Sequence, residues 1–503
     1  MSTAKRALTG TFFVAINSYI SLLIYFIAGI FLARILNPSD FGVYRIALFL
    51  VDLFSRFKEF GLDQALIHKQ EGLDKAYRAH FTLQLTLSLL SLVASVVLAP
   101  VIVSYYSPVV FTFIILISIS YIFQALGSTQ RISLEKNLLF KRTALVDIVS
   151  LALSSTISVV MAFSGFGALS LVAGYSLNII FSTAMLWIIR PWRVPLREIL
   201  IFEKAELLWF IKFGFFLFIG GLTTFILYKY NDFILGTFLS VTALGFYSRA
   251  FNYAQIPTSL ITSVISKVAL PTYSSLQNEK EKLSETFFIV LKSIVRVSFP
   301  LSLVLYLVAD DFTVFILGNK WSPMVPIFRI LLIYGVLRSV FDDLGGLFTA
   351  VGRPKIVSKY LFIQAIAILL LAPVLTYLYK APGSAISLSI VLALGIVLAY
   401  TFLGRIIKIK TLDVFLPTMI ICALTLLGFK FTVFKFNLNF GEPLVSLVSK
   451  GLIFSFYYLI FVLLIDGRSM IRDIKFIYAH VKLKDLPVDP LEDLERQAVT
   501  RQV

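Results

Sequence analysis

The sequence is poor in cysteine, histidine and charged residues, and each shortage excludes a class of protein. Cys422 is the one cysteine among 503 residues, so no disulfide can form within the chain. Three histidines, His68, His80 and His480, argue against a buried metal centre, and we expect no cofactor. Charged residues make up 15% of the chain and hydrophobic residues 58%, against about 25% and 45–50% in soluble domains. The composition therefore excludes a soluble enzyme and a disordered chain, and a mean hydropathy of +0.90 is typical of a membrane protein.

Long apolar runs fill most of the chain. A membrane-spanning helix needs about 20 apolar residues, and the runs predict an all-α integral membrane protein with about fourteen transmembrane helices. The first run lacks a small-residue cleavage site, so we interpret it as a retained helix. The predicted spans cover residues 10–33, 42–62, 81–104, 109–130, 143–163, 167–189, 207–228, 243–270, 286–308, 322–350, 356–379, 383–404, 412–434 and 446–465.

Basic residues indicate the orientation of the spans, because cytoplasmic loops are enriched in lysine and arginine. Lys5 and Arg6 favour a cytoplasmic N-terminus, and an even number of spans then places the C-terminus on the same side. The net charge of +17 is spread between apolar runs, so we expect a membrane surface as partner and no nucleic acid. The inner loops carry Lys69, Lys75, Arg78, Arg131, Lys136, Lys141, Arg142, Arg190, Arg193, Arg197, Lys204, Lys280, Lys282, Arg353, Lys355, Lys359, Arg405, Lys408 and Lys410, whereas the outer loops carry only Arg34, Lys229, Lys320, Lys380, Lys430 and Lys435.

A weak internal repeat relates residues 32–48 to residues 235–251. At a constant offset, Gly42, Tyr44 and Ala47 match Gly245, Tyr247 and Ala250; coincidence in apolar sequence is the alternative explanation. An offset of six spans gives both halves the same orientation and predicts two pseudo-symmetric six-helix lobes with a site between them. The expected parts are an N-terminal lobe at 1–206, a C-terminal lobe at 207–404, two further spans at 405–465 and a cytoplasmic tail at 466–503.

Charged residues inside the second span are the first candidates for a functional site. The spacing of Arg45, Asp52, Arg56 and Glu59 places all four on one helical face. Charges within a membrane are costly and persist where they face water or one another. The stripe therefore forms either the wall of a polar cavity or a salt-bridge ladder that ties the span to its neighbours.

The eighth span has a similar stripe, formed by Arg249, Asn252 and Gln255. Amide side chains on such a face suit sugar hydroxyls, although they also join helices to one another. The set of membrane-depth cations predicts a cavity with a positive field that would attract an anionic headgroup, because arginine makes forked hydrogen bonds to phosphate. Each cation taken alone could equally be structural. The remaining cations of this set are Lys212, Arg296, Arg329 and Arg338.

Motifs for energy conversion and catalysis are missing from the sequence. It has no phosphate-binding GxxxxGK[ST] loop and no zinc-binding histidine motif. The predicted outer loops are short and contain no histidine, which argues against a polytopic glycan polymerase or ligase. We therefore predict a transporter and not an enzyme, with that membrane enzyme and a multidrug or toxin exporter as alternatives.

Five segments of the chain stand out as motifs: LARILNPSDFGVYRIA (32–47), GLDQALIHK (61–69), LGFYSRAFNYAQIP (244–257), ALPTYSSLQNEKEKL (269–283) and GNKWSPMVPIFRIL (318–331). They resemble segments of the Wzx-type polysaccharide flippases, in particular their WzxC-like branch, within the multidrug/oligosaccharidyl-lipid/polysaccharide exporter superfamily. They occur in the expected order across most of the chain, whereas residues 405–465 carry no recognised motif.

This resemblance implies two lobes in a V around a central cavity. It implies that an undecaprenyl-pyrophosphate-linked oligosaccharide moves from the inner to the outer leaflet of the bacterial plasma membrane, with polymerase and chain-length proteins as partners. By the same resemblance, Arg45, Arg56 and Arg249 would hold the pyrophosphate. The first span departs from the family pattern because it has no mid-membrane cation, and Arg34 lies at its outer end. A drug exporter would instead have twelve spans and an acidic site.

Overall fold

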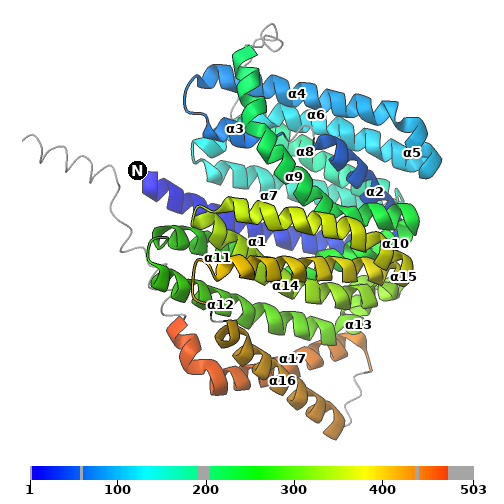
Figure 1. Cartoon of the computed structure of the whole chain (residues 1–503). Coiled ribbons are helices and arrows are strands. Elements are labelled where there is room, and N and C mark those ends of the chain that lie inside the picture. The colour runs from blue at the N-terminus through cyan, green and yellow to red at the C-terminus, as the bar shows by residue number, and fades with distance from the viewer. Residues whose placement is uncertain (1–2, 57–59, 190–203, 410, 437–440, 474–503) are drawn as a thin grey trace, which may run out of the picture.

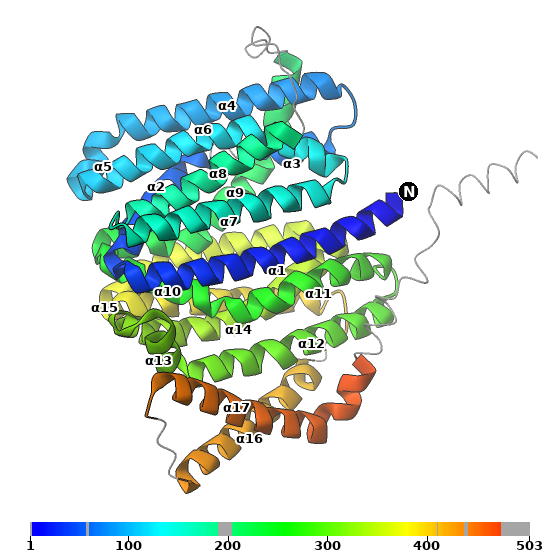
Figure 2. The same cartoon turned by 180° about the vertical axis from the view of Figure 1, so that it is seen from behind.

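The structure is a computed structural model that describes residues 3–56, 60–189, 204–409, 411–436 and 441–473. Within these ranges the chain is all helix and connecting turns, which confirms the predicted fold class. The helices lie side by side in a stack, with α4 at one edge and α16 and α17 at the other (Figure 1 and Figure 2). They are α1 (Thr3–Ile35), α2 (Pro38–Ser55), α3 (Leu62–His68), α4 (Leu73–Val97), α5 (Ala99–Tyr105), α6 (Pro108–Lys136), α7 (Phe140–Phe163), α8 (Leu169–Ile189), α9 (Lys204–Phe238), α10 (Val241–Ala254), α11 (Ile256–Ser275), α12 (Lys280–Leu307), α13 (Ala309–Phe312), η2 (Thr313–Leu317), η3 (Asn319–Met324), α14 (Val325–Ala350), α15 (Pro354–Leu403), α16 (Thr411–Lys435), α17 (Pro443–Phe461) and η4 (Val462–Asp466).

Eleven helices in the described ranges are long and apolar enough to cross a membrane. The predicted count of about fourteen differs from this number at three places and stays a prediction. Helix α2 is short and carries several charges, and the predicted eighth span is divided between α10 and α11. Helix α15 has 50 residues and contains a non-helical residue, Lys380, where two predicted spans meet.

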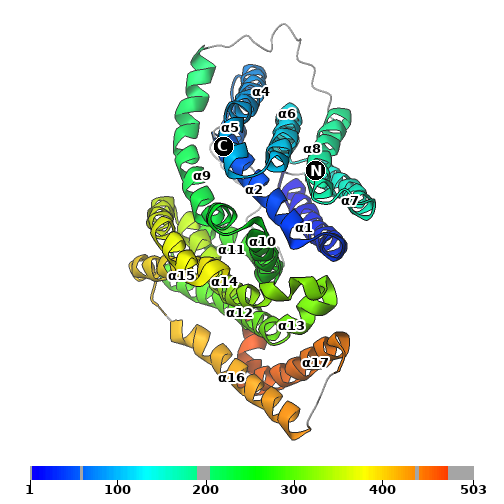
Figure 3. The ribbon, with the colours of Figure 1, turned by 90° about the vertical axis from the view of Figure 1, so that its right-hand side faces the viewer.

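Seen along the helices, with many of them end-on, the structure divides into two groups of helices (Figure 3). Helices α1, α2 and α4–α8 form one group, helices α10–α15 form the other, and the long α9 runs beside both. Helices α16 and α17 lie beyond α12. This grouping resembles the predicted lobes, but the boundaries at residues 206 and 404 stay predictions.

The internal repeat has a physical basis in the crossing of α2 and α10. Asn37 caps α2 and Ser240 caps α10, and these residues are equivalent in the repeat. A Cβ atom built on Gly42 would lie 1.6 Å from the Val241 carbonyl oxygen, and one on Gly245 would lie 1.9 Å from the Pro38 carbonyl oxygen. The two glycines therefore make the same contact in opposite directions, because only a residue without a side chain permits this backbone approach.

Candidate functional site

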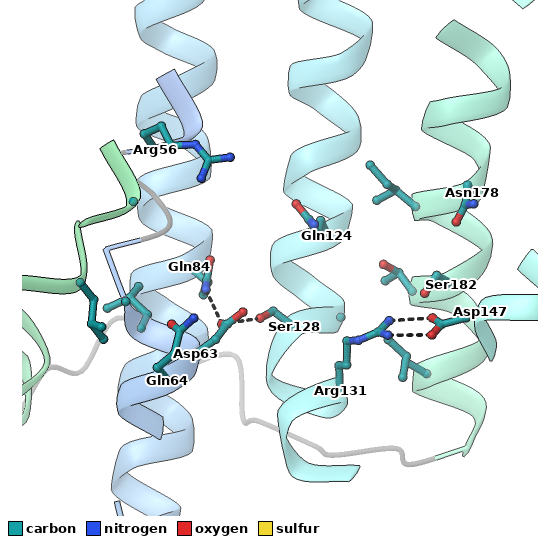
Figure 4. A pocket seen from close by; sticks show the side chains of 18 residues that line it. Arg56, Asp63, Gln64, Gln84, Gln124, Ser128, Arg131, Asp147, Asn178 and Ser182 are labelled. Atoms are coloured by element: carbon teal, nitrogen blue, oxygen red, sulfur yellow. Dashed lines mark hydrogen bonds and ion pairs between the residues drawn. The ribbon is translucent and has the colours of Figure 1, made fainter. Parts of the chain in front are cut away.

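A polar cavity of about 560 Å³ lies within the first group of helices and extends to α9 (Figure 4). Arg56 lies at one end, and Arg131 and Asp147 lie at the other. Polar groups facing hydrocarbon would each cost several kcal/mol, so we expect a cavity lined in this way to hold water. The polar lining residues are Arg56, Asp63, Gln64, Gln84, Gln124, Ser128, Arg131, Asp147, Asn178, Ser182 and Thr183.

Asp63 joins three elements at the wall of the cavity. Its Oδ1 atom accepts hydrogen bonds from Gln84 Nε2 at 2.8 Å and Ser128 Oγ at 3.0 Å, and it lies 2.9 Å from His80 Nε2. The other ring nitrogen of His80 lies 2.9 Å from Thr129 Oγ1. This carboxylate thus has a structural role, because its partners fix α3 against α4 and α6.

The carboxylate of Asp147 also accepts hydrogen bonds from other side chains of the protein. Arg131 donates to both of its oxygens, at 2.8 and 2.9 Å, and Asn17 Nδ2 donates to Oδ2 at 3.0 Å. These contacts tie α6 and α7 to α1. In contrast, Asn178 and Ser182 have no hydrogen-bond partner within the described part of the chain, and both line the cavity. The open hydrogen-bonding capacity of the cavity therefore includes a neutral amide and a hydroxyl.

Most of these cavity residues were not anticipated from the sequence. Gln84, Gln124, Asp147 and Asn178 are isolated polar residues within apolar runs, and that signal could have found them. Arg131 was assigned to an inner loop, because it follows the predicted end of its span. In the structure α6 continues to Lys136 and carries Arg131 into the cavity wall.

The charged residues of α2 divide between ion pairs with α9 and the wall of the cavity. Arg45 Nε lies 2.7 Å from Asp232 Oδ2 of α9, and Asp52 lies 3.8 Å from Lys229 Nζ of the same helix. These two ion pairs tie α2 to α9. Arg56 instead lines the cavity, with its guanidinium 5.3 Å from the centre of the Phe225 ring.

Asp52 also has a tyrosine partner. Asp52 accepts a hydrogen bond from the Tyr121 hydroxyl at 2.6 Å, which in turn lies 2.9 Å from the Tyr175 hydroxyl. Glu59, the last residue of the predicted stripe, lies outside the described residues.

Arg249 lies close to α2 but has no acidic partner in the described ranges. Its guanidinium stacks 3.8 Å from the centre of the Phe41 ring, and it approaches the backbone of α1 at Gly29, where an added Cβ would lie 3.4 Å from Nη1. On the same helix Asn252 is exposed, and Gln255 is half-buried at the junction with α11. An arginine stacked on a ring and without a carboxylate is available to an anion.

The remaining predicted site residues are dispersed. Lys212 is exposed near the start of α9. Arg338 donates to Asp342 at 2.7 Å and lies 4.5 Å from the centre of the Tyr228 ring of α9.

Arg296 and Arg329 form ion pairs with aspartates of the protein. Arg296 is 6% exposed and pairs with Asp466 at 2.6 Å and Asp473 at 3.1 Å, which fixes α12 to the C-terminal helices. Arg329 pairs with Asp310 at 2.6 Å on a more open surface. We leave both out of the proposed site, because their charges are used locally.

Hydrogen bonds hold the end of α1 against η2 and η3, where the chain turns into α2. Arg34 donates to the carbonyl oxygens of Phe315 and Ile316, and Trp321 Nε1 donates to the Ala33 carbonyl oxygen at 2.8 Å. Lys320 donates to the Arg34 carbonyl oxygen at 2.8 Å. Together with the glycine crossing, these contacts hold the two groups of helices together at this end of the molecule, which the predicted orientation places outside. Arg34 thus acts here as a structural residue.

The sequence of the chain is similar to those of known proteins. A family described as polysaccharide biosynthesis protein matches residues 31–326. An uncharacterized membrane protein in the cps region of Klebsiella pneumoniae is 28% identical over 414 residues, which are 80% of this chain and 83% of that protein. The lipopolysaccharide biosynthesis protein WzxC of Escherichia coli (strain K12) is 25% identical over 375 residues, 73% and 76% of the two chains.

Solved structures show the same fold. The lipid II flippase MurJ in an inward closed conformation superposes with a TM-score of 0.72 at 16% identity, over 91% of this chain and 99% of that one. An inward-facing multidrug resistance transporter of the MATE family gives a TM-score of 0.59 at 13% identity, over 80% and 98%. The chain is thus a multi-pass all-α membrane protein with the fold of these transporters, and by its sequence it belongs to the polysaccharide biosynthesis protein family.

Proposed function

We propose that this protein moves undecaprenyl-pyrophosphate-linked oligosaccharide repeat units from the inner to the outer leaflet of the bacterial plasma membrane, for surface polysaccharide synthesis. The observation that carries the proposal is the polar cavity with Arg56 in its wall, together with Arg249, which stacks on Phe41 and has no acidic partner in the described ranges. The names of the relatives support it, because they refer to the synthesis of lipopolysaccharide and teichuronic acid.

The physical problem for such a carrier is the sugar. Each unpaired hydroxyl in hydrocarbon costs several kcal/mol, so a glycan does not cross a bilayer unaided. In a cavity lined by amide and hydroxyl groups, such as those of Asn178 and Ser182, these groups form the hydrogen bonds that the sugar hydroxyls would otherwise make with water. The polyprenyl tail needs no such help and stays in the bilayer.

Arg56 and Arg249 are the cations that we propose as contacts of the pyrophosphate. Arg56 lies at one end of the cavity, and Arg249 has no carboxylate partner in the described ranges. Arg45 contributes less field, because Asp232 neutralises it at 2.7 Å. Lys212, Asn252, Gln255 and Arg338 lie apart from one another on α9, α10 and α14 and stay in the proposal as further polar groups that the substrate would meet during transport.

The closed outer end indicates that the substrate enters from the inner side. Separation of α2 from α10 at the glycine crossing, and of Ala33 from Trp321, would open the outer end as the two groups of helices rock against each other. We further propose cytoplasmic N- and C-termini, in accord with the lysine and arginine distribution, and polymerase and chain-length proteins as partners that receive the flipped unit.

Deletion of the gene tests the proposal in the native host. Lipid-linked oligosaccharides are extracted and analysed by mass spectrometry after leaflet-selective labelling of intact cells. We expect complete repeat units to accumulate in the inner leaflet. An unchanged lipid pool with altered resistance to cationic drugs would instead favour the multidrug exporter.

Substitution of the two arginines should slow transport. Arg56→Gln and Arg249→Gln each remove a charge-assisted hydrogen bond to phosphate, worth about 1.5–3 kcal/mol. In each variant, we therefore expect the repeat unit to reach the outer leaflet about tenfold or more slowly than in wild type. Arg353→Gln, at an exposed site between α14 and α15, is the matched control and should transport normally. Normal rates in both arginine variants would remove the pyrophosphate assignment.

The amide in the cavity wall should matter for the glycan. Asn178→Leu keeps a similar volume but removes the donor and acceptor that Asn178 presents to the cavity. We expect complete repeat units to move about fivefold more slowly, from the loss of one hydrogen bond. Thr156→Leu, on the exposed face of α7, should not change the rate. Equal rates for wild type and Asn178→Leu would show that the glycan does not use this cavity.

A further inference from the structure

Asp343 on α14 is a buried carboxyl group with no cationic partner among the described residues. Its side chain is 6% exposed, and its Oδ1 atom accepts a hydrogen bond from the Tyr273 hydroxyl at 3.0 Å. Its Oδ2 atom is buried without a hydrogen-bond partner. The guanidinium of Arg338, on the same helix, is engaged by the neighbouring Asp342 at 2.7 Å.

The surroundings of Asp343 supply phenols and no compensating charge in the described part of the chain. Tyr273 of α11 is fully buried, and Tyr360 of α15 is 1% exposed with its hydroxyl oxygen also lacking a partner. Tyr400 of α15 lies within electrostatic range of Asp343. Elsewhere on α14, Ser298 of α12 lies against Ser339, and Phe251 of α10 lies against Tyr334. The charged group that α13 brings to α14, Asp310, is paired with Arg329.

Burial of an unpaired carboxylate costs many kcal/mol, and a carboxyl group avoids this cost by holding a proton. A proton on Oδ2 would also turn that buried, unpartnered oxygen into a hydrogen-bond donor. We propose that Asp343 is a proton-binding site that couples transport to the proton gradient. This inference rests on the proposed function for its coupling role, but not for proton binding itself.

The position of Asp343 connects it to the helices that must move. Its neighbour Asp342 holds Arg338, which stacks on Tyr228 of α9 at 4.5 Å. The next residue of α9, Lys229, pairs with Asp52 of α2. A change in the charge of Asp343 therefore acts one residue away from Asp342, and the two contacts of α9 named above together involve both groups of helices. A proton bound in one conformation and released in the other would link the two movements.

Infrared difference spectroscopy of the purified, nanodisc-embedded full chain tests proton binding directly. We expect wild type to show the carbonyl stretch of a protonated carboxylic acid that disappears as the pH rises. Asp343→Asn should lack this band and still fold, since the amide is neutral and can accept the Tyr273 hydrogen bond. Asp342→Asn should retain it. Tyr273→Phe should move the titration midpoint up by about one pH unit, because it removes a hydrogen bond to the charged form.

Coupling is then tested in proteoliposomes that contain the lipid-linked oligosaccharide of the native host. A gradient of two pH units, worth about a hundredfold in driving force for one coupled proton, should change the wild-type rate and leave the Asp343→Asn rate unchanged. If wild type moves no substrate, the proposed function fails, and the infrared titration still decides the site. An Asp343 band absent at every pH, or present unchanged in Asp343→Asn, overturns the proposal, as does a site that responds to Na⁺ and not to protons.

Discussion

Gly42→Leu will abolish the closed state of the outer end and with it most of the transport. A Cβ at this position would lie 1.6 Å from the Val241 carbonyl oxygen, and the obstacle is backbone that cannot rotate away. Overpacking of a close contact typically costs 1–3 kcal/mol, and a collision with backbone lies at or above the upper end. We therefore expect the closed conformation to lose about 3 kcal/mol, roughly a hundredfold in population.

The measurement is the transport rate in proteoliposomes together with the thermal midpoint in detergent. Gly245→Leu should give the same result, because its added Cβ would meet the Pro38 carbonyl oxygen at 1.9 Å. Gly451→Ala is the matched control, since a Cβ at Gly451 of α17 meets nothing within 4 Å; it should be neutral or slightly stabilising. A fully active Gly42→Leu would show that α2 and α10 do not need to approach in the transport cycle.

Arg296→Met will destabilise the attachment of the C-terminal helices. The guanidinium lies between Asp466 and Asp473, which are 5% and 1% exposed, and its removal leaves two buried carboxylates with one fewer cation. Loss of one partner from a buried ion pair costs about 3–5 kcal/mol. Lys292, 2.9 Å from Asp466, compensates only part of this loss. We expect a lowered thermal midpoint and increased hydrogen exchange in α16 and α17.

Arg329→Met provides the contrast for that measurement. Arg329 also pairs with an aspartate at 2.6 Å, but the Asp310 side chain is 63% exposed. Pairs of this kind contribute about 0–1 kcal/mol, because water screens them. The thermal midpoint should therefore change little. Equal losses in the two variants would mean that burial of the Arg296 cluster does not determine its contribution.

Much of the fold could be predicted from the sequence, because apolar runs and positive-inside loops report directly on membrane helices. The repeat could also be found, and the contact between Gly42 and Gly245 explains why it is weak. Only the capping residue and the glycine are needed at the crossing, and the other positions face different neighbours. The division of the eighth predicted span at Gln255 was not predicted; Pro257 stands in the first turn of α11.

The candidate site was predicted less completely. A stripe on one helix shows which side chains share a face, but not which helix lies opposite. Arg45 and Arg56 lie on the same stripe, yet Asp232 neutralises the first and the second lines the cavity. Arg296 has the sequence signature of a cavity cation, and its acidic partners lie 170 residues or more along the chain. Long-range pairing of this kind carries no local signal.

Reconstitution of the purified protein is the most direct test of the central claim that the polar cavity carries a lipid-linked glycan. The lipid-linked oligosaccharide of the native host is placed in proteoliposomes, and its transfer between leaflets is followed by the access of a membrane-impermeant glycosidase. We predict rapid transfer with wild type and about tenfold slower transfer with Arg56→Gln. Transfer that is no faster with wild type than in protein-free vesicles would contradict the account.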